Sequence, residues 1–228
     1  LVADSMGAIV ALLYGAGLSP DDIQALFEDF PAASLFDVIF PTAGGFLDQA
    51  RFMATLRAMV GDLDLADLPI PVMILCDDLP TRRQVRVASG DFVEVMAAAF
   101  ALPGVFAPIR SGDLALIDGG VTNLVPVEAA YAYGRRVVAA TALYGKQFDY
   151  RSAFVVLNRA IDVGKTRKSV EELLARRPPV IRCDVEDLSY MKFSSPAEVA
   201  RRGYDSARAA MGDVVAVAGP PRPLTPAL

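Results

Sequence analysis

Two short segments of the chain carry residue types suited to nucleophilic catalysis. In the first, Ala3-Asp4-Ser5-Met6-Gly7, a serine stands between small residues ahead of an apolar stretch. A serine on a sharp strand-to-helix turn exposes its hydroxyl at the positive end of the helix, where nearby negative charge is stabilised. Asp4 is a residue type that tolerates the unusual backbone angles of such a turn. On this motif alone, we favour the simpler interpretation that Ser5 caps the helix.

The second segment is Asp118-Gly119-Gly120, which directly follows the apolar run 114–117. The two glycines permit backbone angles that hold a carboxylate at a strand end, although the motif by itself is equally typical of a turn. The two segments are stronger together, because a serine hydroxyl needs a base to become nucleophilic. The chain contains no histidine, and no Ser-x-x-Lys spacing follows Ser5. A carboxylate is the remaining obvious base, and a Ser5–Asp118 dyad fits this composition.

Composition excludes several other classes of protein. Hydrophobic residues make up 54% of the 228 residues, so we expect a folded core. The formal net charge of −5, without a basic block, argues against nucleic acid as a partner. No apolar run approaches the roughly 18 residues of a membrane-spanning helix. Cys76 and Cys183 are too few for a disulfide framework or a conventional zinc site, and we expect both to be buried, reduced thiols.

The elements that must position the two motifs alternate along the chain. We predict helices over 6–16, 20–29, 48–60, 91–101, 126–133, 151–177 and 195–211, the 151–177 stretch as one helix or two. Strands are predicted over 1–3, 71–76, 84–88, 114–117, 136–141 and 180–185. This alternation predicts a single α/β domain over 1–218, with a largely parallel central sheet flanked by helices. The proline-rich tail 219–228 is expected to be irregular.

Three segments, in this order, resemble the patatin-like phospholipases. They are Asp4-Ser5-Met6-Gly7 with the residues that follow as far as Pro20, then Ala99 to Pro108, and finally Asp118-Gly119-Gly120-Val121-Thr122-Asn123 with Pro126-Val127. The resemblance extends to about residue 140, and the remainder of the chain matches only loosely, through a strand and a closing helix. The combined order and spacing make the resemblance specific.

The resemblance implies a patatin-like α/β sandwich that hydrolyses acyl esters of phospholipids, lysophospholipids or neutral lipids. It implies that Ser5 is the nucleophile and Asp118 its base, and that no metal or cofactor takes part. It places Asp4, Met6 and Gly7 in the nucleophile elbow and Gly119 and Gly120 in the loop of the base.

Two departures from the family pattern keep a second interpretation open. Ala3 replaces the usual glycine, which is a mild change. The family also carries a glycine-rich oxyanion loop upstream of the serine strand, and we expect this loop and the first strand to lie outside the chain given. The alternative is therefore a catalytically inactive relative that binds lipid or regulates. A nucleotide-binding α/β domain is disfavoured, because no Gly-x-Gly-x-x-Gly follows a strand.

Two further features bear on lipid contact. The loop-like stretch 30–47 contains Phe36, Phe40 and Phe46, which form either an acyl-chain wall or flap, or a part of the core, and we hold the core slightly ahead. A basic cluster, Lys165, Arg167, Lys168, Arg176 and Arg177, fits acidic headgroups, but the interleaved Glu171 and Glu172 favour a solvated helix face. The expected partners are a lipid or acyl-ester substrate and a transient membrane surface, with no nucleic acid and a cytoplasmic location. The oligomeric state stays open.

Overall fold

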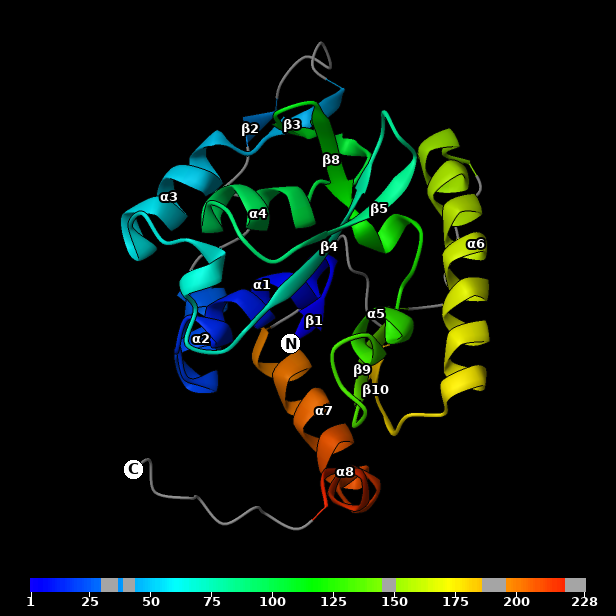
Figure 1. Cartoon of the computed structure of the whole chain (residues 1–228). Helices are drawn as coiled ribbons and strands as arrows, with labels where there is room; N and C mark the ends of the chain where they lie inside the picture. Colours follow the sequence, from blue (N-terminus) through cyan, green and yellow to red (C-terminus); the bar gives the residue numbers. More distant parts are fainter. Residues whose placement is uncertain (30–36, 39–43, 145–150, 186–195, 220–228) are drawn as a thin grey trace. The chain divides into compact units, whose positions relative to one another are not determined.

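The computed structural model describes residues 1–29, 37–38, 44–144, 151–185 and 196–219. It divides into two compact units. Figure 1 labels the helices and strands along the chain. Unit 1 comprises Leu1–Pro126 with Phe148–Glu171, and unit 2 comprises Val127–Gln147 with Glu172–Leu228. The α/β class predicted from the alternating pattern is confirmed, whereas the single domain over 1–218 stays a prediction.

The main sheet of unit 1 is built around β4 (Met73–Asp78), all six residues of which are buried. Strand β1 (Val2–Ala3) pairs with β4 in parallel, while β5 (Arg83–Val87) and β8 (Leu114–Asp118) pair with it antiparallel. Strand β7 (Ile109–Ser111) pairs antiparallel with β8. The expected parallel pairing thus holds for β1 in this sheet and not for its other pairs. For β4–β5 and β7–β8 the reason is that tight turns connect the strands, and such turns can join only antiparallel strands. The antiparallel β4–β8 pair is formed by strands far apart in sequence.

Two strands of a second sheet of unit 1, β2 (Asp37–Val38) and β3 (Gly45–Asp48), form in the stretch predicted to be loop-like. Strand β3 pairs antiparallel with β2 and parallel with β6 (Gly104–Phe106). The prediction of a loop is wrong for these residues. Gly45 shows why the pairing is possible: a Cβ there would lie 2.3 Å from the carbonyl carbon of Phe106, so only glycine permits the approach. Such short strands depend on a distant partner and leave little local signal.

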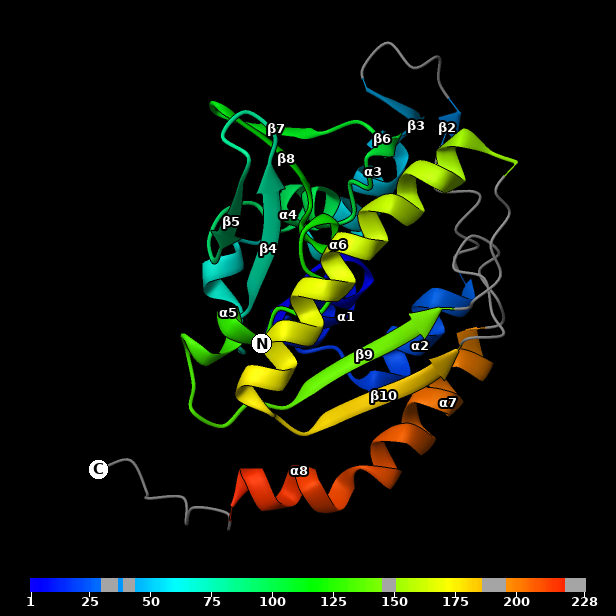
Figure 2. The ribbon, with the colours of Figure 1, turned by 90° about the vertical axis from the view of Figure 1, so that its right-hand side faces the viewer.

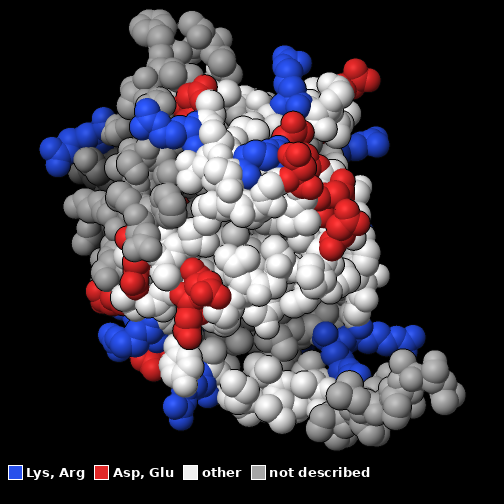
Figure 3. Space-filling view, turned by 90° about the vertical axis from the view of Figure 1, so that its left-hand side faces the viewer, with Lys and Arg blue, Asp and Glu red and all other residues white. Residues whose placement is uncertain are grey.

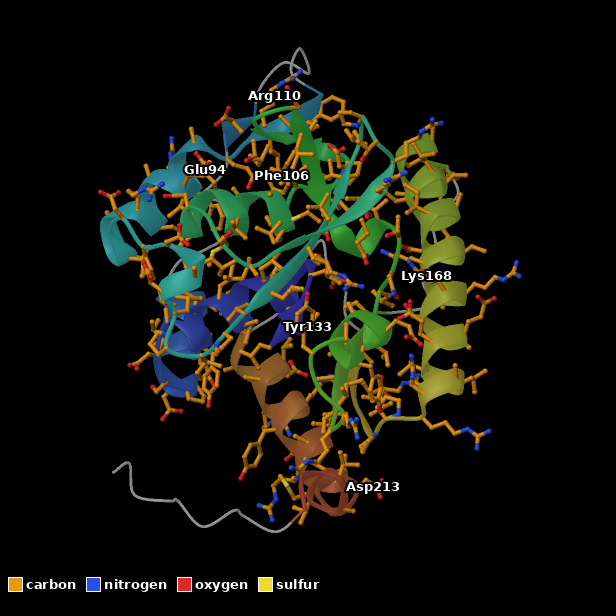
Figure 4. All side chains as sticks on the ribbon, viewed as in Figure 1. Glu94, Phe106, Arg110, Tyr133, Lys168 and Asp213 are labelled. Carbon is orange, nitrogen blue, oxygen red and sulfur yellow. The ribbon has the colours of Figure 1, made fainter. Side chains whose placement is uncertain are left out.

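The helices of unit 1 enclose its apolar core. They are α1 (Ser5–Gly15), α2 (Pro20–Asp29), α3 (Ala50–Val60), α4 (Phe92–Ala99), the 3₁₀ turns η2 (Leu65–Asp67) and η3 (Gly119–Val121), and the part of α6 (Ala153–Arg176) up to Glu171. The core joins α1 and α4 to β4, with Leu12, Ile74 and Phe92 fully buried. Phe106, which is labelled in Figure 4, packs against Phe100 at the end of α4, with ring centroids 5.2 Å apart and the rings tilted by 42°.

The start of α2 carries a side-chain cap. The Ser19 hydroxyl accepts a hydrogen bond from the Asp22 amide and donates one to the Asp22 carboxylate. The stretch 151–177 forms a single helix, α6, which resolves the choice between one helix and two.

Unit 2 is built on a pair of parallel strands, β9 (Ala139–Tyr144) and β10 (Val180–Val185). Helix α7 (Pro196–Ala209) packs along β10, and α8 (Met211–Ala218) follows it (Figure 2). The short helix α5 (Val127–Tyr131) and the end of α6 complete the unit. The helix predicted over 195–211 is therefore divided at Ala210, and the tail from 220 lies outside the described residues.

Two expectations about composition are met in the described part of the chain. Cys76 in β4 and Cys183 in β10 are both buried and free, as predicted. Among the described residues, no helix combines the length and apolar character needed to cross a membrane.

Candidate active site

The two sequence motifs meet because β1 and β8 occupy the same edge of β4. Ile74 of β4 pairs with both Ala3 and Val87, so β1 and β5 lie on opposite edges. Cys76 pairs with Val85 of β5 and with Asp118, so β8 lies on the edge that β1 also uses. Since β1 is parallel and β8 antiparallel to β4, their carboxyl ends approach each other from opposite directions. The two strands end on either side of Leu75, which lies between Ile74, the partner of Ala3, and Cys76, the partner of Asp118.

Ser5 lies at the turn from β1 into α1. Asp4 is extended, with φ −141° and ψ 170°, and Ser5 follows at φ 49°. A positive φ is uncommon for a residue with a side chain, and such strain gathers at functional sites. Helix α1 has no side-chain cap and no acid in its first turn, so the prediction that Ser5 caps the helix is wrong. The Ser5 hydroxyl instead donates to Asp118 Oδ2 over 2.7 Å, across 113 positions of sequence.

Asp118 is held by its own loop as well as by Ser5. Its side chain is only 3% exposed, and its Oδ1 accepts a 2.8 Å hydrogen bond from the Gly120 amide. Burial raises the pKa of Asp118, while the hydrogen bonds from Ser5 and Gly120 and the charge of Lys165 oppose that rise. The interpretation of Asp118-Gly119-Gly120 as a turn is also correct, since η3 begins there. The turn and the contact with Ser5 use different carboxylate oxygens.

The residues around Ser5 differ in their steric environment and in their exposure to solvent. A Cβ on Gly7 would lie 4.0 Å from the Ala3 Cβ, which is an ordinary contact. The requirement for glycine at position 7 is therefore weaker than the motif suggests, and Ala3 is accommodated. Met6 is exposed beside the serine, with 37% of its surface accessible.

The two glycines of the base loop are tightly enclosed. A Cβ on Gly119 would lie 2.3 Å from the Leu75 carbonyl oxygen, so the backbone of the loop presses against β4. A Cβ on Gly120 would lie 3.0 Å from Asp118 Oδ1 and 3.6 Å from the Ser5 Cβ. Side chains at these positions would displace the loop or crowd the pair.

Two other buried carboxylates lie near the pair, Asp4 of the elbow and Asp77, which no sequence motif indicated. Asp4 and Asp77 are 9% and 6% exposed, and each has a buried oxygen, Oδ2, without a hydrogen-bond partner. Burial and the charges of Asp118 and Asp77 raise the pKa of Asp4 well above its usual range, which favours its neutral form. Burial also raises the pKa of Asp77 to about 6, against the hydrogen bond from Thr122. An acid directly after a fully apolar strand was the available signal for Asp77.

The basic residues of α6 make different contacts. Arg167 pairs with Glu171, and Arg176 with Glu128 in unit 2, as expected for solvated helix faces. The Lys165 side chain is mostly buried and contacts Asp162 over 2.8 Å, so its assignment to a solvated face is wrong. Lys168 projects from the same helix, and its charge lowers the pKa of Asp77 (Figure 4). Figure 3 shows a different face, the left-hand side of Figure 1, on which lysines and arginines are interspersed with acids.

One of the three residues considered for acyl binding, Phe46, lies in the described part of the chain. Phe46 lies on β3 and is 54% exposed, whereas Phe36 and Phe40 lie outside the described residues. Among the described residues, no group of three or more histidines, cysteines or acids is arranged to hold a metal ion. Cys76 lies opposite Asp118, but burial raises its pKa to about 12, so it stays a neutral and inert thiol.

Comparison with known proteins agrees with this geometry. The patatin-like phospholipase family matches residues 3–131, more than half of the chain. The uncharacterized NTE family protein Rv1063c of Mycobacterium tuberculosis (strain ATCC 25618 / H37Rv) is 26% identical over 149 residues, or 64% of this chain and 41% of that protein. NTE family protein Mb1092c of Mycobacterium bovis (strain ATCC BAA-935 / AF2122/97), also uncharacterized, matches with the same figures.

A third relative extends the comparison. The uncharacterized NTE family protein Rv2565 of M. tuberculosis H37Rv is 27% identical over 134 residues, or 56% of this chain and 22% of that protein. The chain thus spans less than half the length of these curated relatives. The family match includes both the Ser5 turn and the Asp118 loop. The chain belongs to the patatin-like phospholipase family.

Proposed function

We propose that this protein is a serine-dependent lipid acyl hydrolase, a phospholipase, lysophospholipase or esterase that uses Ser5 and Asp118 as a dyad. The observation that carries the proposal is the 2.7 Å hydrogen bond from Ser5 Oγ to Asp118 Oδ2. Its geometry suits proton transfer, since a general base must lie within about 2.6–3.2 Å of the atom whose proton it takes. Membership of the patatin-like family supports the same chemistry.

The proposed reaction begins at the Ser5 hydroxyl. Its proton moves to Asp118 as Oγ bonds to the ester carbonyl carbon, and the carbonyl electron pair moves onto oxygen. The tetrahedral intermediate collapses, the bond to the alcohol breaks, and Asp118 returns the proton to the leaving alcohol. Water then attacks the acyl-enzyme while Asp118 takes its proton, and Ser5 leaves with that proton as the fatty acid is released.

The surroundings of the pair support this chemistry. The uncapped amides at the start of α1 lie at the positive end of the helix, where they stabilise the negative charge that develops beside Ser5. Lys165 favours the ionised form of Asp118, which the first step requires. Exposed apolar side chains such as Met6 and Phe46 fit an acyl chain and a transient contact with a lipid surface. The two free cysteines fit a reducing, cytoplasmic location.

The proposal is tested by reaction with a fluorophosphonate probe, followed by intact mass. We expect one adduct on Ser5 in the unmodified protein and none in Ser5→Ala or Asp118→Asn. Ser19→Ala is the matched control, because Ser19 also stands at a helix start and its hydroxyl bonds to Asp22. Its labelling should equal that of the unmodified protein. A folded protein that forms no adduct would overturn the proposal and favour an inactive, lipid-binding relative.

A further inference from the structure

A buried serine on α6 makes more contacts than its place in a helix requires. Ser169 is 3% exposed, although its neighbours Lys168 and Val170 are exposed. A helical serine commonly bonds back to the carbonyl four residues earlier, and Ser169 Oγ lies 2.9 Å from the Lys165 oxygen. Beyond this bond, Ser169 Oγ contacts three consecutive residues, 123–125, of the segment that follows η3.

The contacts of Ser169 hold that segment by both its backbone and a side chain. The amides of Leu124 and Val125 donate to Ser169 Oγ over 2.8 and 3.0 Å. The same oxygen lies 2.7 Å from Asn123 Oδ1, which shares the single hydroxyl hydrogen of Ser169 with the Lys165 carbonyl. Asn123 is itself only 2% exposed. Buried amides that lose their acceptor destabilise a structure, so this hydroxyl satisfies a specific need of the segment.

A short chain of hydrogen bonds leads from this point to Asp118. The amides of Thr122 and Asn123 donate to the Gly119 carbonyl over 3.2 and 3.4 Å. The Gly120 amide donates to Asp118 Oδ1 over 2.8 Å. On the other side of the loop, the Thr122 hydroxyl donates to Asp77 Oδ1 over 3.0 Å, which joins the loop to β4. The segment from Asp118 to Val125 is therefore fastened to the sheet at one side and to α6 at the other.

We propose that Ser169 is a positioning residue, which fastens the loop of Asp118 to α6 and thereby keeps the carboxylate in contact with Ser5. This inference rests on the proposed function. It assigns to α6, a helix outside all three segments of family resemblance, control over the geometry of the reacting pair. An error of about 1 Å in the placement of a reacting group can slow a reaction about 100-fold.

The test compares Ser169→Ala with the unmodified protein. We expect the rate constant for fluorophosphonate labelling of Ser5, and kcat for a short soluble ester, to fall roughly 10- to 100-fold while KM stays unchanged. Asn123→Ala, which removes the side-chain acceptor from the loop, should slow labelling similarly. Ser169→Thr keeps the hydroxyl and should label within about threefold of the unmodified protein. The matched control is Thr55→Ala, because Thr55 Oγ1 also bonds to the carbonyl four residues earlier, in α3.

A second readout separates positioning from a general loss of stability. The Ser5 and Gly120 hydrogen bonds lower the pKa of Asp118, so a loosened loop should move the acid limb of the labelling rate to higher pH. The other groups that act electrostatically with Asp118, namely Asp4, Asp77, Cys76 and Lys165, are unchanged in the variant. A folded Ser169→Ala protein with unchanged rate and acid limb would overturn the inference. So would a Ser169→Thr protein as slow as Ser169→Ala. Absence of labelling in the unmodified protein would instead overturn the proposed function itself.

Discussion

Gly119 approaches Leu75 so closely that a Cβ on the glycine would lie 2.3 Å from the Leu75 carbonyl oxygen. Leu75 is the residue of β4 at which the ends of β1 and β8 converge, between the partners of Ala3 and Asp118. The contact is between two stretches of backbone, so no side-chain rotation can relieve it. The close approach sets the position from which Asp118 reaches Ser5.

The first prediction concerns this contact. We expect Gly119→Ala to lower the free energy of unfolding by about 3 kcal/mol and to slow Ser5 labelling, because the loop must move away from β4. Thermal unfolding and the labelling rate measure the two effects. Gly7→Ala is the control, since its Cβ would meet only the Ala3 Cβ, at 4.0 Å. Replacing a helical glycine should leave stability unchanged or raise it by up to about 1 kcal/mol. Equal destabilisation by both variants would contradict this account.

The second prediction is the pH dependence of Ser5 reactivity. Only the ionised form of Asp118 can accept the serine proton, and burial raises the pKa of this carboxyl above its usual range. Labelling should therefore fall as the pH drops through that raised value, so reactivity is present on the alkaline side and lost on the acidic side. Rate constants measured from about pH 4 to pH 8 test this. On the alkaline side, the rate of Asp118→Asn should be at least about 100-fold lower than that of the unmodified protein, and it should not change through the acid limb. An acid limb that persists in that variant would assign the base to another group.

The third prediction is a pH-dependent stability that comes from Asp77. Its pKa is raised to about 6, so between its unfolded value and pH 6 the folded protein binds a proton that the unfolded chain has released. Stability should fall as the pH rises through this window, by about 3 kcal/mol from this group. Asp77→Asn keeps an acceptor for Thr122 and removes the charge, so it should be the more stable protein at about pH 7.

Chemical denaturation at two pH values tests the Asp77 prediction. Near pH 4 the aspartate is protonated in the folded state, and the two proteins should differ by less than about 0.5 kcal/mol. An advantage of Asp77→Asn that is the same at both pH values would mean that packing, and not the buried charge, separates the variants.

The fourth prediction concerns the exposed ring of Phe46. Because 54% of its surface is accessible, Phe46→Asp should leave the unfolding temperature nearly unchanged. If the ring contacts acyl chains, hydrolysis of long-chain esters in vesicles should fall several-fold, while a short soluble ester is hydrolysed at the original rate. Met59→Asp, at a position 44% exposed on α3, controls for added charge. A large loss of stability in Phe46→Asp would show instead that the ring is needed for the fold.

Much of the local structure could be predicted from short-range patterns. The helix at 20–29 follows from its Ser19 cap and the acids in its first turn. Strand β10 has the same bounds as the strand predicted over 180–185. The sequence indicates both candidate catalytic residues, because each stands in a compact motif at the end of a strand. The absence of histidine narrowed the choice of base before any geometry was known.

The arrangement of these parts was decided by the tertiary structure. No local pattern indicates that β1 and β8 share one edge of β4, or that β2 and β3 form in a stretch rich in loop residues. Asp77 and Ser169 gain their importance from partners 45 or so positions away in sequence. A sequence pattern reports backbone preferences and the burial of one face, which are local. The Ser5–Asp118 contact joins residues 113 positions apart. It forms only when strand pairing and core packing offset the loss of chain entropy on closing the segment between them.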